Sequence, residues 1–161
     1  MSTTPSGQTN CGSAGGTNGT STVDPLCRMF QPAVLYSRGE TEIGSGLANT
    51  IAITAVGSGG TAYHAAPVTR AFRGGGKSDW FLPSRDELNE LCKYARQQTT
   101  GNTATLCTSA NSLRTGFTSG NYWSSSELDA ATSTYQRFTD GTRGARNKAE
   151  ADSVRPVRAF G

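Results

Sequence analysis

Aromatic and cationic side chains near the end of the chain have the chemistry of a binding surface. One tyrosine, Tyr135, and three arginines, Arg137, Arg143 and Arg146, lie in the polar segment 128–147. Aromatic rings stack and guanidinium groups make charge-assisted hydrogen bonds, and both residue types are frequent at the energetic centres of interfaces. The same residues also suit an ordinary solvated surface, so their types alone leave both interpretations open.

Catalytic chemistry is poorly supported by the other candidate residues. Ser124–Ser126 lie in an aromatic, strand-like stretch without the G-x-S-x-G turn that exposes a nucleophilic serine. Glu127 and Asp129 have the types of a glycosidase pair, but acids two positions apart in an exposed segment are commonly just solvated. His64 has no recognisable motif around it and is interpreted as structural. We therefore expect no enzymatic activity and no cofactor.

The four cysteines form two local pairs along the chain, Cys11 with Cys27 and Cys92 with Cys107. An even number in a chain rich in Gly, Ser and Thr favours disulfides in an oxidising compartment over free thiols, although four cysteines allow three pairings. Pairing between neighbours would close two short loops, each stabilising the fold by about 3 kcal/mol. A zinc site is disfavoured because there is no C-x-x-C spacing and only one histidine, so no metal site is predicted.

Length and composition favour one domain with short strands and long connections. The chain has 161 residues, of which 34% are hydrophobic and 20 are glycines. Residues 1–30 are expected to form a Gly/Ser/Thr-rich, partly ordered N-terminal segment, and residues 31–161 the working domain. The net charge of +3 is mild for nucleic-acid binding, and no apolar run reaches membrane length. We expect a domain of a secreted or cell-surface protein whose targeting segment is missing from this chain.

Three stretches in the first half of the chain have the patterns of regular elements. Ala33–Ser37 is predicted to be a strand, whereas Asn49–Ala55 suits either a short helix or a short strand. Thr61–Arg73 has an apolar side at helical spacing, and Gly74–Gly76 is expected to end that helix.

The strongest local signal is the start of a helix at Ser84. Ser84 and Glu87 form a capping box, in which each side chain bonds to the other residue's main-chain amide. Asp86 and Glu87 are therefore explained as helix-start residues rather than as a catalytic pair. The apolar face predicted to pack on the sheet consists of Leu88, Leu91, Cys92 and Ala95.

Residues 97–120 form a long polar loop that a Cys92–Cys107 bridge would pin to the end of this helix. The predicted anchors of the loop are Leu106, Leu113 and Phe117.

Two strands, Tyr122–Glu127 and Val154–Phe160, are expected to follow the loop and enclose the irregular segment 128–147. Pro156 places the second strand at an edge or a bulge. Arg155 and Arg158 are expected to pair with Glu127 or Asp152. The predicted aromatic core consists of Trp80, Trp123, Phe138 and Phe160.

The order of these motifs resembles the Lcl C-terminal domain family. The resemblance spans about Ile43 to Phe160 and is carried by Asp79–Leu88, Tyr122–Glu127, Phe138, Gly141, Lys148 and Val154–Phe160. The family is similar in its motifs to the C-type-lectin-like fold, which is shared with formylglycine-generating enzymes and with variable proteins of diversity-generating retroelements. The resemblance implies an α+β fold: a twisted antiparallel sheet with two flanking helices, long loops, and an exposed binding face on its C-terminal strands.

The chain departs from its relatives within residues 128–147. Relatives commonly have an aromatic residue where Thr134 aligns and many asparagines around it, whereas this chain has Thr, Tyr, Arg, Asp, Gly and Ala. All of these are reached by changing the two adenines of an AAC codon, as diversity-generating retroelements do. The predicted ligand-binding residues are Leu128, Asp129, Thr132, Thr134, Tyr135, Arg137, Asp140, Thr142, Arg143, Ala145 and Arg146.

We therefore expect a non-enzymatic surface domain that binds a protein or glycan ligand on a cell or host surface, as a variable protein of a diversity-generating retroelement. The alternative is a non-diversified bacterial adhesin or glycan-binding domain, and a formylglycine-generating-type enzyme is less favoured because the cysteines suit structural bridges. The Glu-Pro-Asn and Trp-Asn-Asp motifs of calcium lectins are absent. Neither a nucleic-acid partner nor membrane insertion is expected, and the oligomeric state is open.

Overall fold

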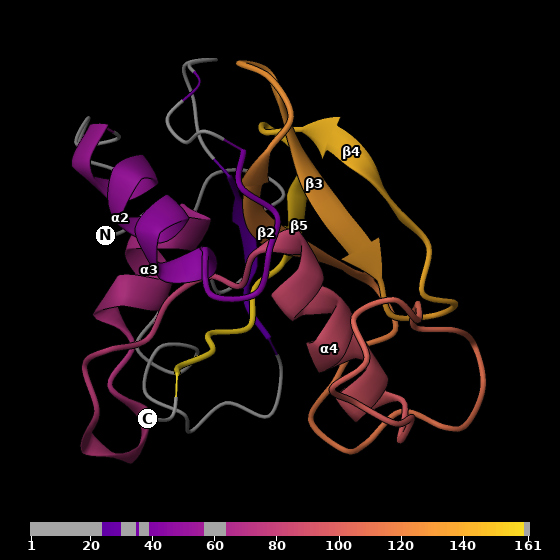
Figure 1. The fold of residues 1–161 in the computed structure, drawn as a ribbon. Coiled ribbons are helices and arrows are strands. Elements are labelled where there is room, and N and C mark those ends of the chain that lie inside the picture. Colours follow the sequence, from indigo (N-terminus) through magenta and orange to yellow (C-terminus); the bar gives the residue numbers. More distant parts are fainter. Residues whose placement is uncertain (1–23, 30–34, 36–38, 57–63, 160–161) are drawn as a thin grey trace.

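The computed structural model describes residues 24–29, 35, 39–56 and 64–159, and in them a five-stranded sheet is combined with helices (Figure 1). The strands are β1 (Leu26–Arg28), β2 (Asn121–Glu127), β3 (Thr132–Arg137), β4 (Arg143–Asn147) and β5 (Ala151–Ser153). The α-helices are α2 (Gly46–Val56), α3 (Ala65–Ala71) and α4 (Arg85–Ala95), and a short 3-10 turn covers Gly74–Gly76. The predicted α+β class is confirmed. No helix in the described ranges is long and apolar enough to cross a membrane.

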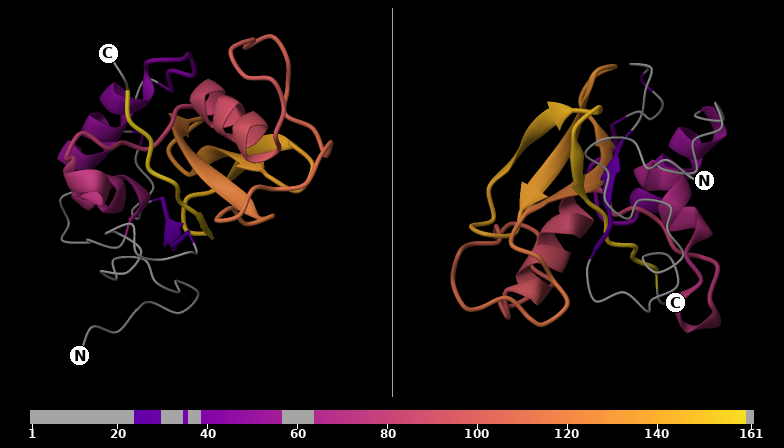
Figure 2. Two further views of the ribbon diagram at one scale, coloured as in Figure 1. Left: turned by 90° about the horizontal axis from the view of Figure 1, so that it is seen from below. Right: turned by 180° about the vertical axis from the view of Figure 1, so that it is seen from behind.

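The sheet has the strand order β1-β5-β2-β3-β4. The pairs β1/β5, β2/β3 and β3/β4 are antiparallel, as predicted, but β2 and β5 run parallel where Tyr122 lies opposite Ser153. After β4, at one edge of the sheet, the chain passes both β3 and β2 before it enters β5. β5 therefore lies on the side of β2 that faces away from β3. Seen from behind in Figure 2, α2 and α3 lie at the opposite end of the sheet from β4.

Two apolar clusters pack on opposite faces of β2, because consecutive side chains of a strand point to opposite faces. Trp123 packs with Ile53 of α2 and Val68 of α3, and Tyr122 packs with Leu88 and other residues of α4. Trp123 and Phe138 are fully buried, which confirms two members of the predicted core. The core is thus divided by the sheet and closed by helices on either side.

The predicted capping box is present at the start of α4. Ser84 Oγ accepts a hydrogen bond of 3.3 Å from the Glu87 amide, and Glu87 Oε2 accepts one of 2.7 Å from the Ser84 amide. The same carboxylate accepts the Gly44 amide at 2.8 Å, and a Cβ at Gly46 would lie 2.1 Å from Glu87 Oε2. The capping residue therefore also fixes the start of α2 against α4.

The structure tests only part of the predictions for the first half of the chain. The strand predicted at Ala33–Ser37 lies outside the described residues apart from Leu35, which is exposed. The alternative at Asn49–Ala55 is decided in favour of helix α2. In the predicted helix Thr61–Arg73, α3 ends at Ala71, before the three glycines, because Phe72 is already extended. Residues 61–63 lie outside the described part.

The sheet begins inside the segment 1–30 that was expected to precede the working domain. Leu26–Arg28 forms β1 and pairs with β5, and Cys27 and Met29 are buried in the core. This strand is too short for a recognisable alternation of apolar and polar residues. Its neighbours on the N-terminal side, residues 1–23, lie outside the described residues.

The predicted strand Val154–Phe160 is wrong. The strand is Ala151–Ser153, and beyond it Val157 makes only an isolated bridge with Phe81, through main-chain bonds of 2.9 Å in both directions. Pro156 has no N–H to extend a ladder. Phe160 lies outside the described residues, and Trp80 is half-buried rather than core, with its Nε1 donating to Gly74 O at 3.2 Å.

The predicted partners of the last two arginines are also wrong. Arg155 Nε lies 2.7 Å from Asp24 Oδ1, and Arg158 Nη2 lies 2.7 Å from Asp79 Oδ2. The irregular path of the chain after β5 directs these guanidinium groups away from the sheet residues Glu127 and Asp152.

Candidate ligand-binding face

The segment 128–147, expected to be irregular, contains the β3–β4 hairpin. Thr134 lies opposite Ala145, Tyr135 opposite Gly144, and the pairing continues in register along both strands. The strand pattern was hidden because polar residues, Ser133 and Gln136, occupy fully buried positions. A search for alternating apolar residues cannot recognise such a strand.

The hairpin register divides the predicted ligand-binding residues between two faces. We call them the pocket face, with Thr132, Thr134, Arg143 and Ala145, and the rear face, with Tyr135, Arg137 and Arg146. Leu128 and Asp129 lie at the bend before β3, and Asp140 and Thr142 lie in the turn between β3 and β4. The predicted residues therefore do not form one continuous surface.

A pocket with a volume of about 310 Å³ lies on the pocket face, beside the start of α4. Of the predicted residues, Leu128, Thr134, Arg143 and Ala145 line it. Gly144 and Arg85 complete the lining. Arg85 was missed because the capping box showed only that it begins a helix, and no local signal indicates which strand that helix end will face.

Two guanidinium groups and one carboxylate set the charge of the pocket. Arg143 Nη1 lies 3.0 Å and Arg85 Nε lies 3.3 Å from the same oxygen, Asp86 Oδ1. Asp86 balances only one of the two positive charges. Because Leu128 is 65% exposed beside them, the pocket combines an excess positive charge with an apolar wall. This combination suits a ligand group that carries a carboxylate next to an apolar side chain.

The first amides of α4 are already bonded within the protein. The Arg85 amide donates to Ser126 Oγ at 3.0 Å, and the Asp86 amide donates to Thr41 O at 3.0 Å. With the Glu87 amide bonded to Ser84 Oγ, the helix start has little capacity left for an anion. The groups of the pocket that could bind an anion are therefore its side chains, not the amides of the helix start.

The rear face is engaged largely with the protein itself. Tyr135 is half-buried, packs against the Trp123 cluster and covers Gly144, where a Cβ would lie 3.0 Å from its ring. Arg146 Nη1 lies 2.8 Å from Asp152 Oδ1, and its Nη2 lies 3.2 Å from Glu150 Oε2. These contacts give Tyr135 and Arg146 structural roles that their residue types did not indicate.

The predicted acids hold the two bends of the hairpin. Asp129 Oδ1 accepts the amides of Ala131 at 2.8 Å and Thr132 at 2.7 Å. Asp140 Oδ1 accepts Arg137 Nε and the Thr142 amide, both at 3.0 Å. The hydrogen bond from Arg137, followed by those from Thr142, holds the pKa of Asp140 well below its ordinary value. Among the described residues, no group of three or more His, Cys, Asp or Glu is placed to hold a metal ion.

Comparison with known proteins identifies the family. Residues 47–158 match the model of the Lcl C-terminal domain. The chain belongs to this family. No curated protein and no solved structure matches it.

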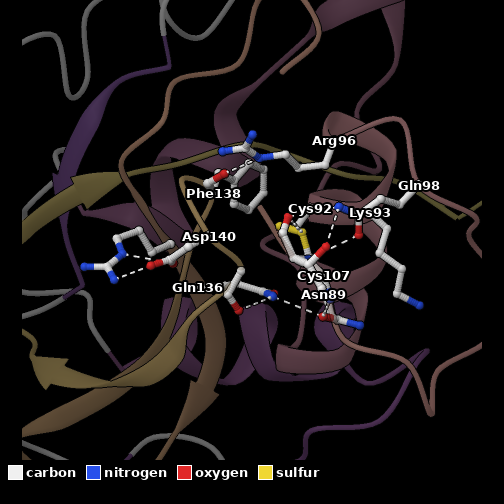
Figure 3. Close-up of a disulfide and its surroundings, with 12 residues drawn as sticks. Asn89, Cys92, Lys93, Arg96, Gln98, Cys107, Gln136, Phe138 and Asp140 are labelled. Carbon is white, nitrogen blue, oxygen red and sulfur yellow. Dashed lines mark hydrogen bonds and ion pairs between the residues drawn. A yellow bond between two sulfur atoms is a disulfide. The ribbon is translucent and has the colours of Figure 1, made fainter. Parts of the chain in front are cut away.

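A disulfide joins the long loop of this Lcl C-terminal domain to α4 (Figure 3). Cys92 and Cys107 are bridged with a Cα–Cα distance of 5.9 Å, which confirms this predicted pair. Among the described residues no cysteine is free, and Cys11 of the other predicted pair, Cys11–Cys27, lies outside them. Of the predicted loop anchors, Leu113 and Phe117 pack on the α4 cluster, whereas Leu106 is exposed.

Asn89 connects the loop to the hairpin beside this disulfide. Its Oδ1 accepts the Cys107 amide and Gln136 Nε2, both at 3.0 Å, and Gln136 Nε2 also donates to Gly141 O at 3.1 Å (Figure 3). Gly141 has a φ of +80°, and a Cβ there would lie 1.9 Å from Cys107 O. Gly141, one of the residues that carried the family resemblance, therefore allows the β3–β4 turn to dock on the disulfide loop.

Arg96, at the C-terminal end of α4, bonds to the residue that follows β3. Its Nε donates to Phe138 O at 2.7 Å (Figure 3). Its Nη1 donates to Asn111 O at 2.8 Å, so one side chain binds both the hairpin and the loop. The Lcl C-terminal domain thus holds the β3–β4 turn by a disulfide, an amide network and a buried guanidinium group. The hairpin is presented as a fixed surface.

Proposed function

We propose that this domain is a non-catalytic binding module of a secreted or cell-surface protein, and that it recognises a protein ligand with the pocket face of the β3–β4 hairpin. The observation that carries the proposal is the convergence of four predicted residues on one pocket with Arg85. Arginine is one of the residue types enriched at the energetic centres of interfaces, and the exposed Leu128 adds apolar area beside it. The α4 network supports the proposal because a fixed surface loses less conformational entropy on binding.

We infer further that the fold is C-type-lectin-like. The short mixed sheet, the helices on both of its faces, the long disulfide-pinned loop and the C-terminal hairpin support this inference. In such an arrangement the helices and β2 form a scaffold, while β3, β4 and their bends carry the side chains of the proposed binding face.

We also propose that the hairpin is the diversified region of a retroelement variable protein. The burial of each hairpin side chain in the structure indicates which codons such a retroelement should diversify. Diversified codons should encode the accessible side chains of Leu128, Thr142, Arg143 and Ala145, and they should spare Ser133 and Gln136, which are fully buried. The measurement is DNA sequencing of the locus for an adenine-rich near-copy of this segment beside a reverse transcriptase gene. If there is no such copy, the domain is a non-diversified adhesin, and if its adenines fall on the buried codons, the exposed side chains of the hairpin are not the diversified ones.

Binding itself is tested with the labelled domain on intact cells, on arrayed cell-surface proteins and on an arrayed set of glycans. The triple variant Leu128→Ser, Arg143→Ser, Ala145→Asp should lose protein binding, while Arg73→Ser, an exposed arginine away from the hairpin, should bind as the unchanged domain does. Unfolding temperatures of all three proteins control for folding. Equal binding by the triple variant would refute the proposal, and binding to glycans alone would favour the glycan-binding alternative.

A further inference from the structure

β4 is the outermost strand of the sheet, and in the described part of the chain no other strand pairs with its outer edge (Figure 1). Two hydrogen bonds show which of its main-chain groups face outward. Arg137 N donates to Thr142 O at 2.8 Å, and Lys148 N donates to Ala131 O at 2.9 Å. Since bonded and non-bonded pairs alternate in an antiparallel ladder, Gly144 and Arg146 bond to β3. Arg143, Ala145 and Asn147 therefore direct their main-chain groups away from the sheet.

Two of these outward residues have both main-chain groups available. The carbonyl of Asn147 accepts the Glu150 amide at 2.9 Å, whereas no described residue bonds to the outward N–H and C=O of Arg143 or Ala145. β4 also contains no proline. Exposed strand edges are usually protected from pairing by prolines, bulges or charges. Of the outward-directed residues of β4, Arg143 carries a charged side chain, which repels basic segments and attracts acidic ones.

The open edge and the pocket share the same two residues. Arg143 and Ala145 offer their main-chain groups outward and also line the pocket with Arg85 and Leu128. A peptide strand added to β4 would place alternate side chains over the pocket face. One of these would lie opposite Arg143, near the guanidinium groups. The next on that face, two residues along, would lie opposite Ala145 and near Leu128.

We propose that the ligand is an extended peptide segment, with an acidic and an apolar residue two positions apart, that adds to β4 as an outer strand. The main chain of the segment pairs with Arg143 and Ala145, its carboxylate bonds to Arg143 and Arg85, and its apolar side chain packs on Leu128. This inference deepens the proposed function and rests on it. An antiparallel segment carries the apolar residue first, and a parallel segment carries the acidic residue first.

The probe is a short acetylated and amidated threonine peptide with one valine and one glutamate two positions apart, made in both orders. Titration into the ¹⁵N-labelled domain should shift the amide resonances of Arg143, Ala145 and Asn147, together with the side-chain Nε–H resonances of Arg85 and Arg143. One order should bind more tightly than the other. A peptide with glutamine in place of glutamate should bind about tenfold more weakly, as expected for the loss of a charge-assisted hydrogen bond.

Two variants of the domain separate main-chain pairing from charge. Ala145→Pro removes an outward N–H but no bond to β3, so it should weaken binding of the better peptide by about tenfold or more, whereas Ala145→Thr, which keeps the N–H, should not. Arg143→Gln should also weaken binding by about tenfold, and Arg73→Gln should have no effect. Chemical shifts of the β2 and β3 amides establish that each variant keeps its fold.

The inference is overturned if the β4 amides do not shift, if Ala145→Pro binds the peptide as Ala145→Thr does, or if the glutamine peptide binds equally well. These failures are distinguishable from failure of the proposed function. If cell binding requires Leu128, Arg143 and Ala145 but the peptides do not bind, the domain recognises its ligand with these side chains and without strand addition. If substitution of those three residues leaves cell binding unchanged, both proposals are refuted.

Discussion

Lys148 Nζ lies 2.5 Å from Glu127 Oε1, and the two side chains are only 2% and 1% exposed. The pair joins the end of β2 to the turn that follows β4, and the Lys148 main chain bonds to Ala131 and Met29. Lys148→Met should lower the free energy of unfolding by about 3–5 kcal/mol, because it removes a counter-charge that contacts a buried carboxylate. Urea unfolding followed by tryptophan fluorescence measures the change.

The matching control for the buried pair is the double variant Glu127→Met with Lys148→Met. Replacing both charges removes the desolvation cost of each, so the double variant should be more stable than Lys148→Met alone. A loss below about 1 kcal/mol in the single variant would show that the pair is solvated and does not hold the sheet.

Gly141 and Gly116 form a matched pair for testing how the hairpin turn docks. Both have left-handed φ values, +80° and +92°, but a Cβ at Gly141 would lie 1.9 Å from Cys107 O, whereas a Cβ at Gly116 meets nothing within 4 Å. Gly116→Ala should cost about 1–2 kcal/mol for the backbone conformation alone. Gly141→Ala should cost a further 1–3 kcal/mol or so. Equal losses of unfolding free energy would contradict the close approach of the turn to the disulfide loop.

His64 should make stability depend on pH on the acidic side of neutrality. The side chain is 6% exposed, and burial, together with the charge of Arg28, holds its pKa below the ordinary value of 6.5. Between the folded and unfolded pKa values, the unfolded chain therefore binds the proton more readily. The contribution of His64 is complete above pH 6.5 and is lost as the pH falls toward the folded pKa.

His64→Gln should remove this part of the pH dependence. Urea unfolding at about pH 7.5 and about pH 5.5 should show a smaller difference in the variant than in the unchanged domain. Burial raises the pKa of Asp24, which has the opposite effect above pH 3.8, but that residue is present in both proteins and cancels in the comparison. An identical pH dependence in the two proteins would contradict the burial of a neutral imidazole.

Tyr135 and Arg137 should respond differently to replacement although they share the rear face. Tyr135→Ala removes a half-buried ring that packs on the core, so it should lower the unfolding free energy by about 2 kcal/mol or more. Arg137→Ala breaks a pair that is 46% and 35% exposed, and it should cost less than about 1 kcal/mol. A stable Tyr135→Ala variant would show that the ring is displayed to a ligand instead of supporting the sheet.

Features that depend on neighbouring residues were predictable from the sequence. The capping box of Ser84 and Glu87 starts α4 at the expected residue, and Cys92 pairs with Cys107 at a sequence separation of 15. Both features arise from short-range geometry, which the chain carries in its local order. The burial of Trp123 and Phe138 was predictable because large aromatic side chains contribute much apolar area to a core, although the same reasoning failed for the half-buried Trp80.

Only the tertiary structure decided which side chains meet. The hairpin register places Arg143 and Ala145 on the pocket face and Tyr135 on the rear face, and a shift by one residue would exchange the faces. Arg85 joins the pocket across a sequence separation that no local pattern spans. Buried polar residues, Ser133 and Gln136, concealed the strand that carries the site. The sequence alone determined the family and the local features of the scaffold, whereas register and packing between distant segments determined which side chains form the candidate binding face.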